Sequence, residues 1–467
     1  MQHIIETLLL IVNTFFVIYL VGYSTFLILS VVTGAMNLYQ KRQNERMKSE
    51  IFQDLYIPVS IIIPAYNEET TIVDTVRSLL IQDYSVFEIV VVNDGSKDKT
   101  AECMIDFFKM RKVERPVRRV IKCKAEEAIY EATIQGVAIT LVCKENGGKA
   151  DSLNMGINIS RYPYFICMDA DSMLQKNSLQ EIVKPVVEKE NVVACGGHVA
   201  VSNGIILEDG EVRDFSMPKK LIVAMQVLEY ECSFLASRIF LNQFNGNLII
   251  SGAFGLFKKE TVFLVGGYDT STMGEDMELV VKLHAFCKAN HLDYSIEYAP
   301  DAICWSQVPS SLRDLCKQRS RWHIGLFQSL KKYTHIVAKQ EYGLMGTISF
   351  LYFWIYELLS PYIEFLGIIA IIFSFSLNLI NIPYMISFFV IYALFGYILT
   401  LTSFYSRHYL QKMHISIADG FKANVLCILE LVGLRFILMF VRLISLIGYK
   451  KKRHIWGTMS RERHHLN

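Results

Sequence analysis

The sequence predicts an open α/β domain joined to a helical membrane region, and three observations support this fold class. The chain has 467 residues, of which 52% are hydrophobic and only 20% are charged, which is too apolar for an ordinary soluble protein. Short β-branched runs alternate with amphipathic segments between about residues 57 and 307, as in a mostly parallel sheet covered by helices. Long apolar runs lie on both sides of this stretch and predict membrane helices.

The charge and the cysteines narrow the class further. The chain carries 47 Lys and Arg against 45 Asp and Glu, so its net charge is only +2. This balance gives no general basic field, and we expect no nucleic acid among the partners. The ten cysteines are scattered without a Cys-x-x-Cys pair, which favours neither a zinc site nor a disulfide framework. All except Cys427 lie in the part that we expect in the cytosol, so we predict free thiols.

An apolar run opens the chain at residues 4–32. About 20 helical residues cross the hydrocarbon of a bilayer, so this run is long enough to span it with some tilt. A signal peptide is the competing interpretation, but the run is too long for one and has neither a basic n-region nor a clear cleavage site. Four basic residues follow it: Lys41, Arg42, Arg46 and Lys48. The positive-inside rule therefore places the next segment in the cytoplasm.

The soluble part begins with a predicted βαβ unit. Residues 57–64 and 88–93 are short β-branched runs typical of buried parallel strands, and residues 70–82 between them have helical apolar spacing. The two strands end in the polar clusters Pro64-Ala65-Tyr66-Asn67-Glu68 and Asn93-Asp94-Gly95-Ser96. Open α/β sheets bind ligands at this carboxyl edge. The sequence has no Gly-x-Gly-x-x-Gly or Walker motif, which disfavours dinucleotides and ATP.

A Gly-Gly-Lys turn marks the next element. Residues 111–136 have no clear pattern, residues 139–143 predict a strand, and residues 144–151 open a helix that runs to about residue 159. Gly147 and Gly148 would let backbone amides approach an anion, and Lys149 could add its charge to a diphosphate. Most such turns only cap helices, so the motif gains its weight from its position between two polar clusters.

Two carboxylates follow an apolar, strand-like run at residues 165–172. Side chains alternate along a strand, so Asp169 and Asp171 would share a face and could hold one divalent cation. The structural alternative is a strand that ends in an Asx-type turn. A cation at this position would bind the diphosphate of a sugar nucleotide.

Three further stretches carry candidate chemistry. Met273-Gly274-Glu275-Asp276-Met277-Glu278 supplies carboxylates, although an acidic helix start is a common structural feature. Ser251-Gly252-Ala253-Phe254-Gly255 would let a flat sugar ring approach the backbone or would simply pack as a strand. In Gln318-Arg319-Ser320-Arg321-Trp322, a helix would place an amide, a guanidinium and an indole on one face. Such a face suits a sugar ring and a diphosphate, but also a helix at the membrane interface.

Together, these motifs resemble those of the membrane-embedded processive glycosyltransferases of family 2, which include cellulose, mixed-linkage glucan, chitin, hyaluronan and poly-N-acetylhexosamine synthases. The six motifs that match in order are Pro64 to Glu68, Asn93 to Ser96, Gly147 to Ala150, Asp169 to Asp171, Gly274 to Asp276 and Gln318 to Trp322. The resemblance covers roughly residues 57–323 and the plan of flanking membrane helices. It implies a cytosolic GT-A domain, a UDP-sugar donor and a Mg²⁺ or Mn²⁺ cofactor.

The resemblance also implies donor-site roles. Asp94 matches the carboxylate that contacts the uridine base, and Tyr66, with its neighbours Ala65 and Glu68, would wall the base. Asn93 departs from the more usual Asp-Asp-Gly. Asp171 would ligate the metal on the diphosphate, with Asp169 holding the ribose or supporting the metal, and Lys149 would face the donor.

The same resemblance assigns the chemistry to a different carboxylate. Asp276 matches the general base, which takes the proton from the acceptor hydroxyl as it attacks the anomeric carbon. Attack on an α-linked UDP-sugar inverts that centre and yields a β-linkage. Glu275 is the nearest competitor for this role. The motif that accompanies processivity, with contacts to the diphosphate and the acceptor, comprises Gln318, Arg319, Arg321 and Trp322.

The chain returns to apolar sequence after Gly343. Residues 344–380, 385–404 and 424–447 predict crossings, and the first is either one tilted helix or two short ones that meet at Pro361. Lys450 to Arg453 favour a cytoplasmic C-terminus. With the N-terminus outside, this requires an odd number of crossings, so we predict five in total, with four as the alternative. The basic residues Arg407 and Lys412 argue against five. The predicted parts are an anchor with a basic linker (1–50), the cytosolic GT-A domain (51–310), interface helices (311–343), transmembrane helices (344–449) and a basic tail (450–467).

Ionisable residues inside these apolar runs suggest a polar path. They are Glu357, Glu364, Glu430, Arg435 and Arg442. Such groups normally face a bundle interior or water, so we expect some to line a channel for a polar chain. The alternative is that Arg435 pairs with Glu430 and that the others reach the interface. Trp456-Gly457-Thr458 resembles a short motif near the end of hyaluronan synthases.

Three functions fit the sequence. The first is a multi-pass plasma-membrane synthase that polymerises a UDP-hexose or UDP-N-acetylhexosamine into a β-linked polysaccharide and moves it across the membrane. Its partners would be the donor, the growing polysaccharide, the lipid bilayer and export or accessory subunits. The second is a non-processive enzyme that adds a single sugar to a lipid acceptor. The third is an inactive scaffold, which would not need acids at separate donor, metal and base positions.

Overall fold

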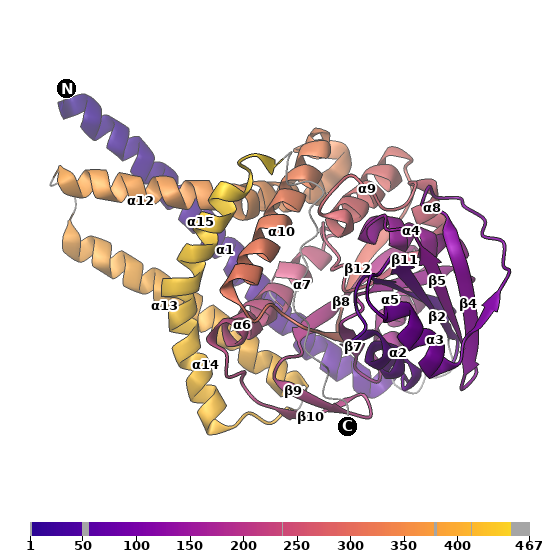
Figure 1. The fold of residues 1–467 in the computed structure, drawn as a ribbon. Coiled ribbons are helices and arrows are strands. Elements are labelled where there is room, and N and C mark those ends of the chain that lie inside the picture. Colours follow the sequence, from indigo (N-terminus) through magenta and orange to yellow (C-terminus); the bar gives the residue numbers. More distant parts are fainter. Residues whose placement is uncertain (1, 49–55, 236, 378–380, 412, 450–467) are drawn as a thin grey trace.

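The structure is a computed structural model that describes residues 2–48, 56–235, 237–377, 381–411 and 413–449. An α/β domain makes up one side of the molecule, and long apolar helices extend from the other side (Figure 1). The predicted tail at residues 450–467, with Trp456-Gly457-Thr458, lies outside the described residues.

A ten-stranded sheet forms the centre of the α/β domain, in the order β3-β4-β5-β2-β1-β6-β11-β8-β12-β7. Its strands are β1 (Val59–Ala65), β2 (Phe87–Asp94), β3 (Arg111–Val113), β4 (Glu126–Ile134), β5 (Val137–Lys144), β6 (Tyr164–Met168), β7 (Ser172–Leu174), β8 (Val192–Val201), β11 (Phe254–Lys258) and β12 (Ser295–Ser306). β5, β2, β1 and β6 are parallel, with Ile61 opposite both Ile89 and Ile166. The carboxyl ends of these four strands therefore meet at one edge.

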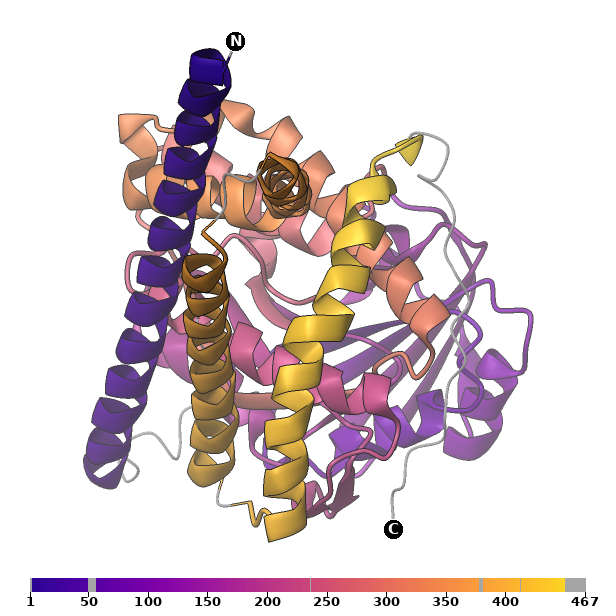
Figure 2. The same ribbon diagram turned by 90° about the vertical axis from the view of Figure 1, so that its left-hand side faces the viewer.

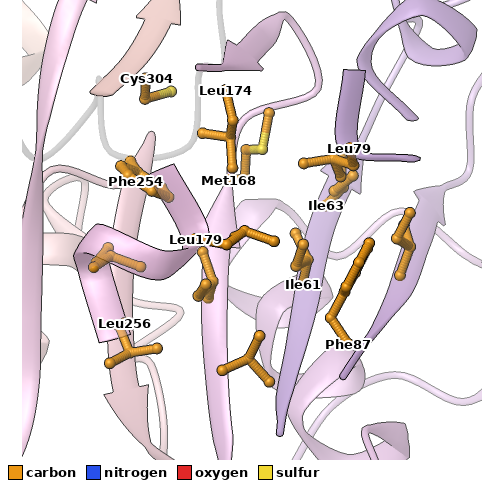
Figure 3. Packing of buried hydrophobic residues seen from close by; sticks show 14 of the residues in the cluster. Ile61, Ile63, Leu79, Phe87, Met168, Leu174, Leu179, Phe254, Leu256 and Cys304 are labelled. Atoms are coloured by element: carbon orange, nitrogen blue, oxygen red, sulfur yellow. The ribbon is translucent and has the colours of Figure 1, made fainter. Parts of the chain in front are cut away.

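Both faces of the sheet are buried under helices. Ile61 and Ile63 point into one apolar cluster, shown in Figure 3, and Ile62 points into a second cluster on the opposite face. This alternation follows from the two-residue period of a strand, and burial on both sides explains the continuous β-branched runs. The covering helices are α2 (Ile72–Leu80), α3 (Thr100–Phe108), α4 (Lys149–Ile159), α5 (Ser178–Glu188), α8 (Lys259–Leu264) and α9 (Glu275–Ala289).

The stretch without a predicted pattern adds strands to one edge of the sheet. β3 pairs with β4, and β4 pairs antiparallel with β5 from Ile134 opposite Val137. Only Ile129 of β4 is fully buried. The hydrophobic pattern is correspondingly weak, which is why residues 111–136 gave no clear prediction.

A second group of elements joins the α/β domain to the apolar helices. It contains the hairpin β9 (Ile205–Glu208) and β10 (Glu211–Phe215), followed by α6 (Leu221–Leu235), α7 (Ser237–Asn242) and α10 (Leu312–Lys332). α6 contacts β8 on one side and α13 (Ile382–Leu410) on the other. These helices therefore position the long apolar helices relative to the sheet.

Among the described residues, two helices are long and apolar enough to cross a membrane, Leu10–Asn37 within α1 (Gln2–Lys48) and Met385–Tyr409 within α13. A bent pair, Met345–Leu358 and Ser360–Ser376, with 52° between its halves, would add a third if it is one span. The break lies next to Pro361, where the sequence allowed two short crossing helices, but the pair counts as at most one span. Two or three spans are fewer than the predicted five or four.

One predicted crossing that is not among these spans is the segment that contains α14 (Ile417–Leu429) and α15 (Arg435–Ser445), which are separated by a π-helical turn at Glu430–Leu434. Asp419 at its start accepts a hydrogen bond from the Met217 amide, 3.0 Å long, and Tyr449 after its end lies 5.4 Å from Phe327 of α10, between ring centroids. Both ends therefore contact the α/β side of the molecule. In Figure 2 this segment lies next to α13, and α1 lies on the other side of α13.

Arg407 also has a different role from the one expected. It lies near the end of α13 and is only 1% exposed, and its Nη1 donates to the Pro300 carbonyl of β12 at 2.9 Å. A buried side chain of this kind fixes the end of α13 against the sheet. Because Arg407 is buried against β12 and does not lie in an exposed loop, its charge does not bear on the positive-inside rule. As predicted, all ten cysteines are free thiols.

Candidate active site

Three of the sequence motifs meet at the ammonium group of Lys149. Its Nζ lies 2.5 Å from Asp169 Oδ1, 3.3 Å from the Gly252 carbonyl oxygen and 3.9 Å from Glu275 Oε1. Lys149 is the first residue of α4, Asp169 follows β6, and Glu275 begins α9. The fold therefore brings together residues that lie more than 120 positions apart, at the carboxyl edge of the parallel strands.

Gly252 lies between the ammonium group of Lys149 and the carboxylate of Asp276. Its amide donates to Asp276 Oδ2 at 3.2 Å. A Cβ atom at this position would lie 3.0 Å from Lys149 Nζ and 3.6 Å from Asp276 Oδ2. A side chain would fill the space between the lysine and the carboxylate, so the glycine keeps this space open.

Burial and charge act in opposite directions in this cluster. Burial disfavours the charged form of Lys149, but Asp169 and Glu275 outweigh it and raise the pKa of Lys149 above its ordinary value. Burial raises the pKa of Glu275 to about 7, against the opposing effect of Lys149. Asp276 is only partly buried, so its carboxylate is the more accessible of the two. Accessibility favours Asp276 as the base, whereas a pKa near neutrality suits Glu275.

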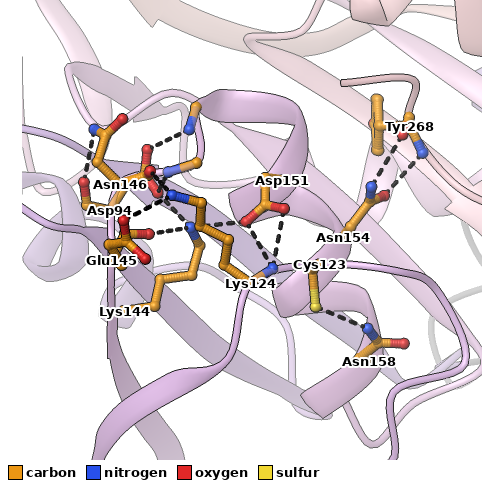
Figure 4. A network of polar contacts seen from close by, with 12 residues as sticks. Asp94, Cys123, Lys124, Lys144, Glu145, Asn146, Asp151, Asn154, Asn158 and Tyr268 are labelled. Atoms are coloured by element: carbon orange, nitrogen blue, oxygen red, sulfur yellow. Dashed lines mark hydrogen bonds and ion pairs between the residues drawn. The ribbon is translucent and has the colours of Figure 1, made fainter. Parts of the chain in front are cut away.

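The predicted base-binding cluster is mostly occupied by internal contacts. Asp94 is 3% exposed, and its two carboxylate oxygens accept the Gly147 amide at 2.9 Å and the Gly148 amide at 2.8 Å (Figure 4). Glu68 is buried and accepts a hydrogen bond from Thr71 at 2.8 Å. Ala65 is buried, and Tyr66 is 36% exposed, so Tyr66 presents the most accessible side chain of the four residues predicted there.

Asp171 is buried next to the strand end and was predicted as the metal ligand. The part of the chain that the structure describes contains no cluster of three or more His, Cys, Asp or Glu side chains that could hold a metal. Mg²⁺ is usually held by one or two carboxylates together with substrate phosphates, so a Mg²⁺ site at the predicted Asp-x-Asp motif would not need a cluster of three protein ligands.

Tyr230 is a site residue that the sequence did not indicate. Burial raises its pKa to about 12, and Asp171 and Asp169 are among the charges that contribute to this shift. Tyr230 comes from α6 and also lies near Arg319 and Glu229. Tyr230 therefore lies within reach of the charges of both the Asp-x-Asp motif and Arg319 of α10. No local pattern marks it, because α6 reaches the site only through tertiary packing.

The Gln-x-x-Arg-Trp motif lies on α10 but divides between two faces. Arg319 is buried, its Nη2 lies 2.7 Å from Glu229 Oε2, and its guanidinium lies 4.5 Å from the centre of the Trp322 ring. Trp322 is 42% exposed. Arg321 instead faces Glu275, where its positive charge opposes in small part the burial that raises the Glu275 pKa. Gln318, expected beside them, is buried.

A backbone contact fixes α10 against the start of α9. A Cβ atom on Gly325 would lie 2.7 Å from both Cα and N of Gly274. Gln328 of α10 strengthens the contact, because its Oε1 accepts a hydrogen bond of 2.9 Å from the Met273 amide. Gly274 directly precedes Glu275 and Asp276, so the position of α10 and that of the candidate base are linked.

Ionisable residues of the apolar helices lie beyond α10. Arg435 Nη2 lies 3.7 Å from Glu364 Oε1, and the charge of Arg435 also acts on Glu430, the partner considered from the sequence. Glu357 accepts a hydrogen bond of 2.9 Å from Tyr352. Arg442 acts on His323 of α10 and adds to the effect of burial, which lowers the His323 pKa to about 4.

Comparisons with known proteins identify the family and the fold. Residues 164–405 match the glycosyl transferase family group 2, and residues 60–260 match glycosyl transferase family 2. The chain belongs to glycosyl transferase family group 2, which confirms the resemblance seen in the sequence. Its GT-A fold is shared with the mannosyltransferase PcManGT from Pyrobaculum calidifontis, solved with GDP-Man and Mn²⁺, at a TM-score of 0.51 and 17% identity over 87% of this chain and 98% of that one.

Two relatives are similar over about two thirds of this chain. The poly-beta-1,6-N-acetyl-D-glucosamine synthase of Staphylococcus epidermidis is 29% identical over 322 residues, which are 68% of this chain and 67% of the relative. The synthase of the same name from Staphylococcus aureus (strain COL) is 29% identical over 312 residues, 66% of this chain and 64% of the relative. The chain thus spans about two thirds of the length of these curated relatives.

Proposed function

We propose that this chain is a processive, inverting glycosyltransferase that polymerises a UDP-sugar into a β-linked polysaccharide and passes the product across the membrane. The observation that carries the proposal is the position of Lys149, which joins the Asp-x-Asp carboxylate Asp169 to Glu275, with Asp276 across Gly252. One small volume thus holds a cation for the diphosphate, acids for a metal and an accessible carboxylate. The names of the staphylococcal relatives make a polymer of N-acetylglucosamine the first product to test.

Donor binding is proposed for the edge where Tyr66, Lys149, Asp169 and Asp171 lie. Asp171, supported by Asp169, would hold Mg²⁺ or Mn²⁺, which neutralises charge on the departing UDP when bound. Lys149 is positioned to give its charge to the diphosphate in place of its present carboxylate partners. The contact of Asp94 with the base would use the carboxylate lone pairs that its internal hydrogen bonds leave available.

Proton abstraction is proposed for Asp276. Its carboxylate is partly exposed and is oriented by the Gly252 amide, so an acceptor hydroxyl can approach it. Loss of that proton makes the acceptor oxygen a better nucleophile toward the anomeric carbon, and direct displacement gives the β-linkage. Glu275, which lies beside Lys149 at the adjacent position, remains the competitor.

Processivity and export are proposed for α10 and the apolar helices. Trp322, backed by Arg319 and Glu229, offers an exposed aromatic face on which a product sugar can stack. α10 contacts α15, and the ionisable groups of α12 (Ser360–Ser376) and α15 continue from it. We propose that Glu357, Glu364, Glu430, Arg435 and Arg442 line the path of the chain.

The membrane arrangement proposed here has three crossings, α1, the bent pair and α13. An N-terminus outside the cell then leaves the α/β domain in the cytoplasm, because α1 leads into it and Arg407 anchors the end of α13 to it. Three is an odd number, as a cytoplasmic C-terminus requires. The α14–α15 segment would lie along the cytoplasmic side. Residues 51–310 remain the proposed catalytic domain and residues 311–343 the proposed interface helices.

Product analysis tests this function. The purified full chain in nanodiscs would be given each UDP-sugar with Mn²⁺ or Mg²⁺, and the products would be sized before and after treatment with linkage-specific hydrolases. We expect high polymer from one donor, with UDP-N-acetylglucosamine as the first candidate. A product with a single sugar on a lipid would contradict the proposal and support the non-processive alternative.

A further inference from the structure

A buried lysine next to the candidate active site has no role in the function described so far. Lys144 ends β5, and its side chain is fully buried. Its ammonium contacts Asp94 Oδ1, lies 2.8 Å from Asp151 Oδ1 and donates to the Glu145 carbonyl at 2.9 Å (Figure 4). Asp151 belongs to the first turn of α4.

Such a charge is stable inside a protein only when it is fully paired. An uncompensated buried ion costs several kcal/mol, and removing one partner of a buried pair is strongly destabilising. Lys144 has two carboxylates around one ammonium, and the remaining negative charge is offset by backbone N–H groups. Asp94 receives those of Gly147 and Gly148, and Asp151 receives that of Lys124 at 3.1 Å.

The cluster of Lys144, Asp94 and Asp151, called here the lysine cluster, sets the shape of the turn before α4. Gly148 has φ +89°, which favours glycine, and a Cβ on Gly147 would lie 2.5 Å from Asp151 Oδ1. The turn is thus pressed against both carboxylates. The residue that follows it is Lys149, whose ammonium lies between Asp169 and Glu275.

We propose that Lys144 is a positioning residue for the donor: it holds Asp94 and Asp151 so that the Gly147–Gly148 turn directs Lys149 into the active site. This inference rests on the proposed function for the statement that Lys149 meets the donor. Lys144 touches no substrate, because its side chain is fully buried. Its effect passes through two hydrogen-bonded glycine amides, which makes it measurable without a substrate.

The first variant is Lys144→Met, which keeps the length of the side chain but removes its charge. Two measurements on the full chain in nanodiscs test it: hydrogen exchange of the Gly147 and Gly148 amides, and UDP affinity in the presence of Mn²⁺. We expect exchange to become at least about tenfold faster and UDP affinity to fall roughly tenfold or more, since loss of one buried charge partner exceeds the free energy of a tenfold change.

Matched variants keep the test decisive. Lys189→Met is the control, because it removes a lysine that lies 2.6 Å from the buried carboxylate Glu297, away from the turn, and it should leave both measurements unchanged. If Lys144→Met does not fold, Lys144→Met/Asp151→Asn removes one unpaired carboxylate and should still show the faster glycine exchange.

Wild-type exchange and wild-type UDP affinity in a folded Lys144 variant would overturn the proposal. A wild-type protein that binds no UDP-sugar and makes no polymer would instead contradict the proposed function. In that case the exchange comparison would still decide whether Lys144 holds the turn, so the two failures are distinguishable.

Discussion

The proposed donor end and the proposed acceptor end of the candidate active site are fixed by different interactions. At the donor end, buried charges and backbone amides hold the Gly147–Gly148 turn and Lys149. At the acceptor end, the backbones of Gly274 and Gly325 touch, and this contact places α10 against the start of α9. The donor end should therefore be sensitive to loss of charge, and the acceptor end to added volume.

This difference follows from what each end has to do. A nucleotide diphosphate is a small anion, and a fixed set of charges can recognise it without much movement. Under the proposed function, the growing polysaccharide has to slide. Its binding surface then needs a fixed shape and few charges, because charges would hold the product in one position. Substitutions can therefore impair one end and leave the other intact, and the following predictions are arranged from the largest expected effect to the smallest.

Asp276→Asn should have the largest effect, because it removes the proposed base but leaves the donor end intact. We expect sugar transfer to fall by about 10²- to 10⁴-fold, the range typical of general base catalysis, with UDP affinity nearly unchanged. Steady-state turnover and UDP binding would be measured on the same preparation. Glu275→Gln is the matched variant, and a larger loss there than in Asp276→Asn would move the base to Glu275.

Gly325→Val should break the acceptor end through volume alone. The new side chain would overlap the Gly274 backbone, so α10 and α9 must separate at a cost of about 1–3 kcal/mol, as for other overpacked contacts. Polymer formation should fall by roughly tenfold to a hundredfold, while UDP affinity stays close to that of the wild type. Gly433→Val is the control, because a Cβ there would meet no atom within 4 Å. Equal effects of the two substitutions would refute the packing explanation.

Trp322→Ala should shorten the product more than it slows transfer. The exposed indole is lost but the donor end keeps all of its contacts, so the KM for the donor should not change. We expect several-fold shorter chains, because stacking of one aromatic ring contributes about 1 kcal/mol. Gel filtration of labelled product would measure the length. Glu229→Gln, which weakens the support of Arg319 behind the ring, should show the same change to a smaller extent.

Glu275→Gln should change how stability depends on pH. The folded-state pKa of Glu275 is about 7, above its ordinary value of 4.5, so the folded protein binds this proton more tightly than the unfolded chain. Stability should therefore fall as the pH rises from about 4.5 to 7 by roughly 2–3 kcal/mol, and this loss should be absent in the variant. Thermal unfolding between pH 4.5 and 8 would measure it. Parallel curves for the two proteins would contradict the assignment.

Much of the donor edge could be predicted from the sequence because its signals are local. The β-branched runs of β1, β2 and β6 are buried on both faces, so each is continuous and ends abruptly in its polar motif. The order of strands along a parallel sheet then brings these motifs together. Lys149 and Asp169 were both assigned to the donor site from the sequence, but their direct ion pair was not predicted.

The residues that the sequence did not reveal depend on contacts between distant elements. Tyr230 and Glu229 belong to the apolar helix α6. No sequence motif marks them, and their proximity to Asp171 and Arg319 follows from tertiary packing. In the sequence, Lys144 is an ordinary lysine at the end of a strand. Its role depends on the ion pair with Asp151 of α4, which only the fold brings close. Gly325 has no unusual neighbours in sequence, and its importance follows from the crossing of α9 and α10.

The central claim, that one chain stays bound while many sugars are added, is tested most directly by the length of the product at early times. The purified enzyme would be held at low concentration with excess donor, and the polymer would be sized while only a small fraction of the donor has been used. The account predicts long polymer from the first samples, with a length that depends little on the extent of reaction. Short products that lengthen uniformly with turnover, or a single sugar on a lipid, would contradict it.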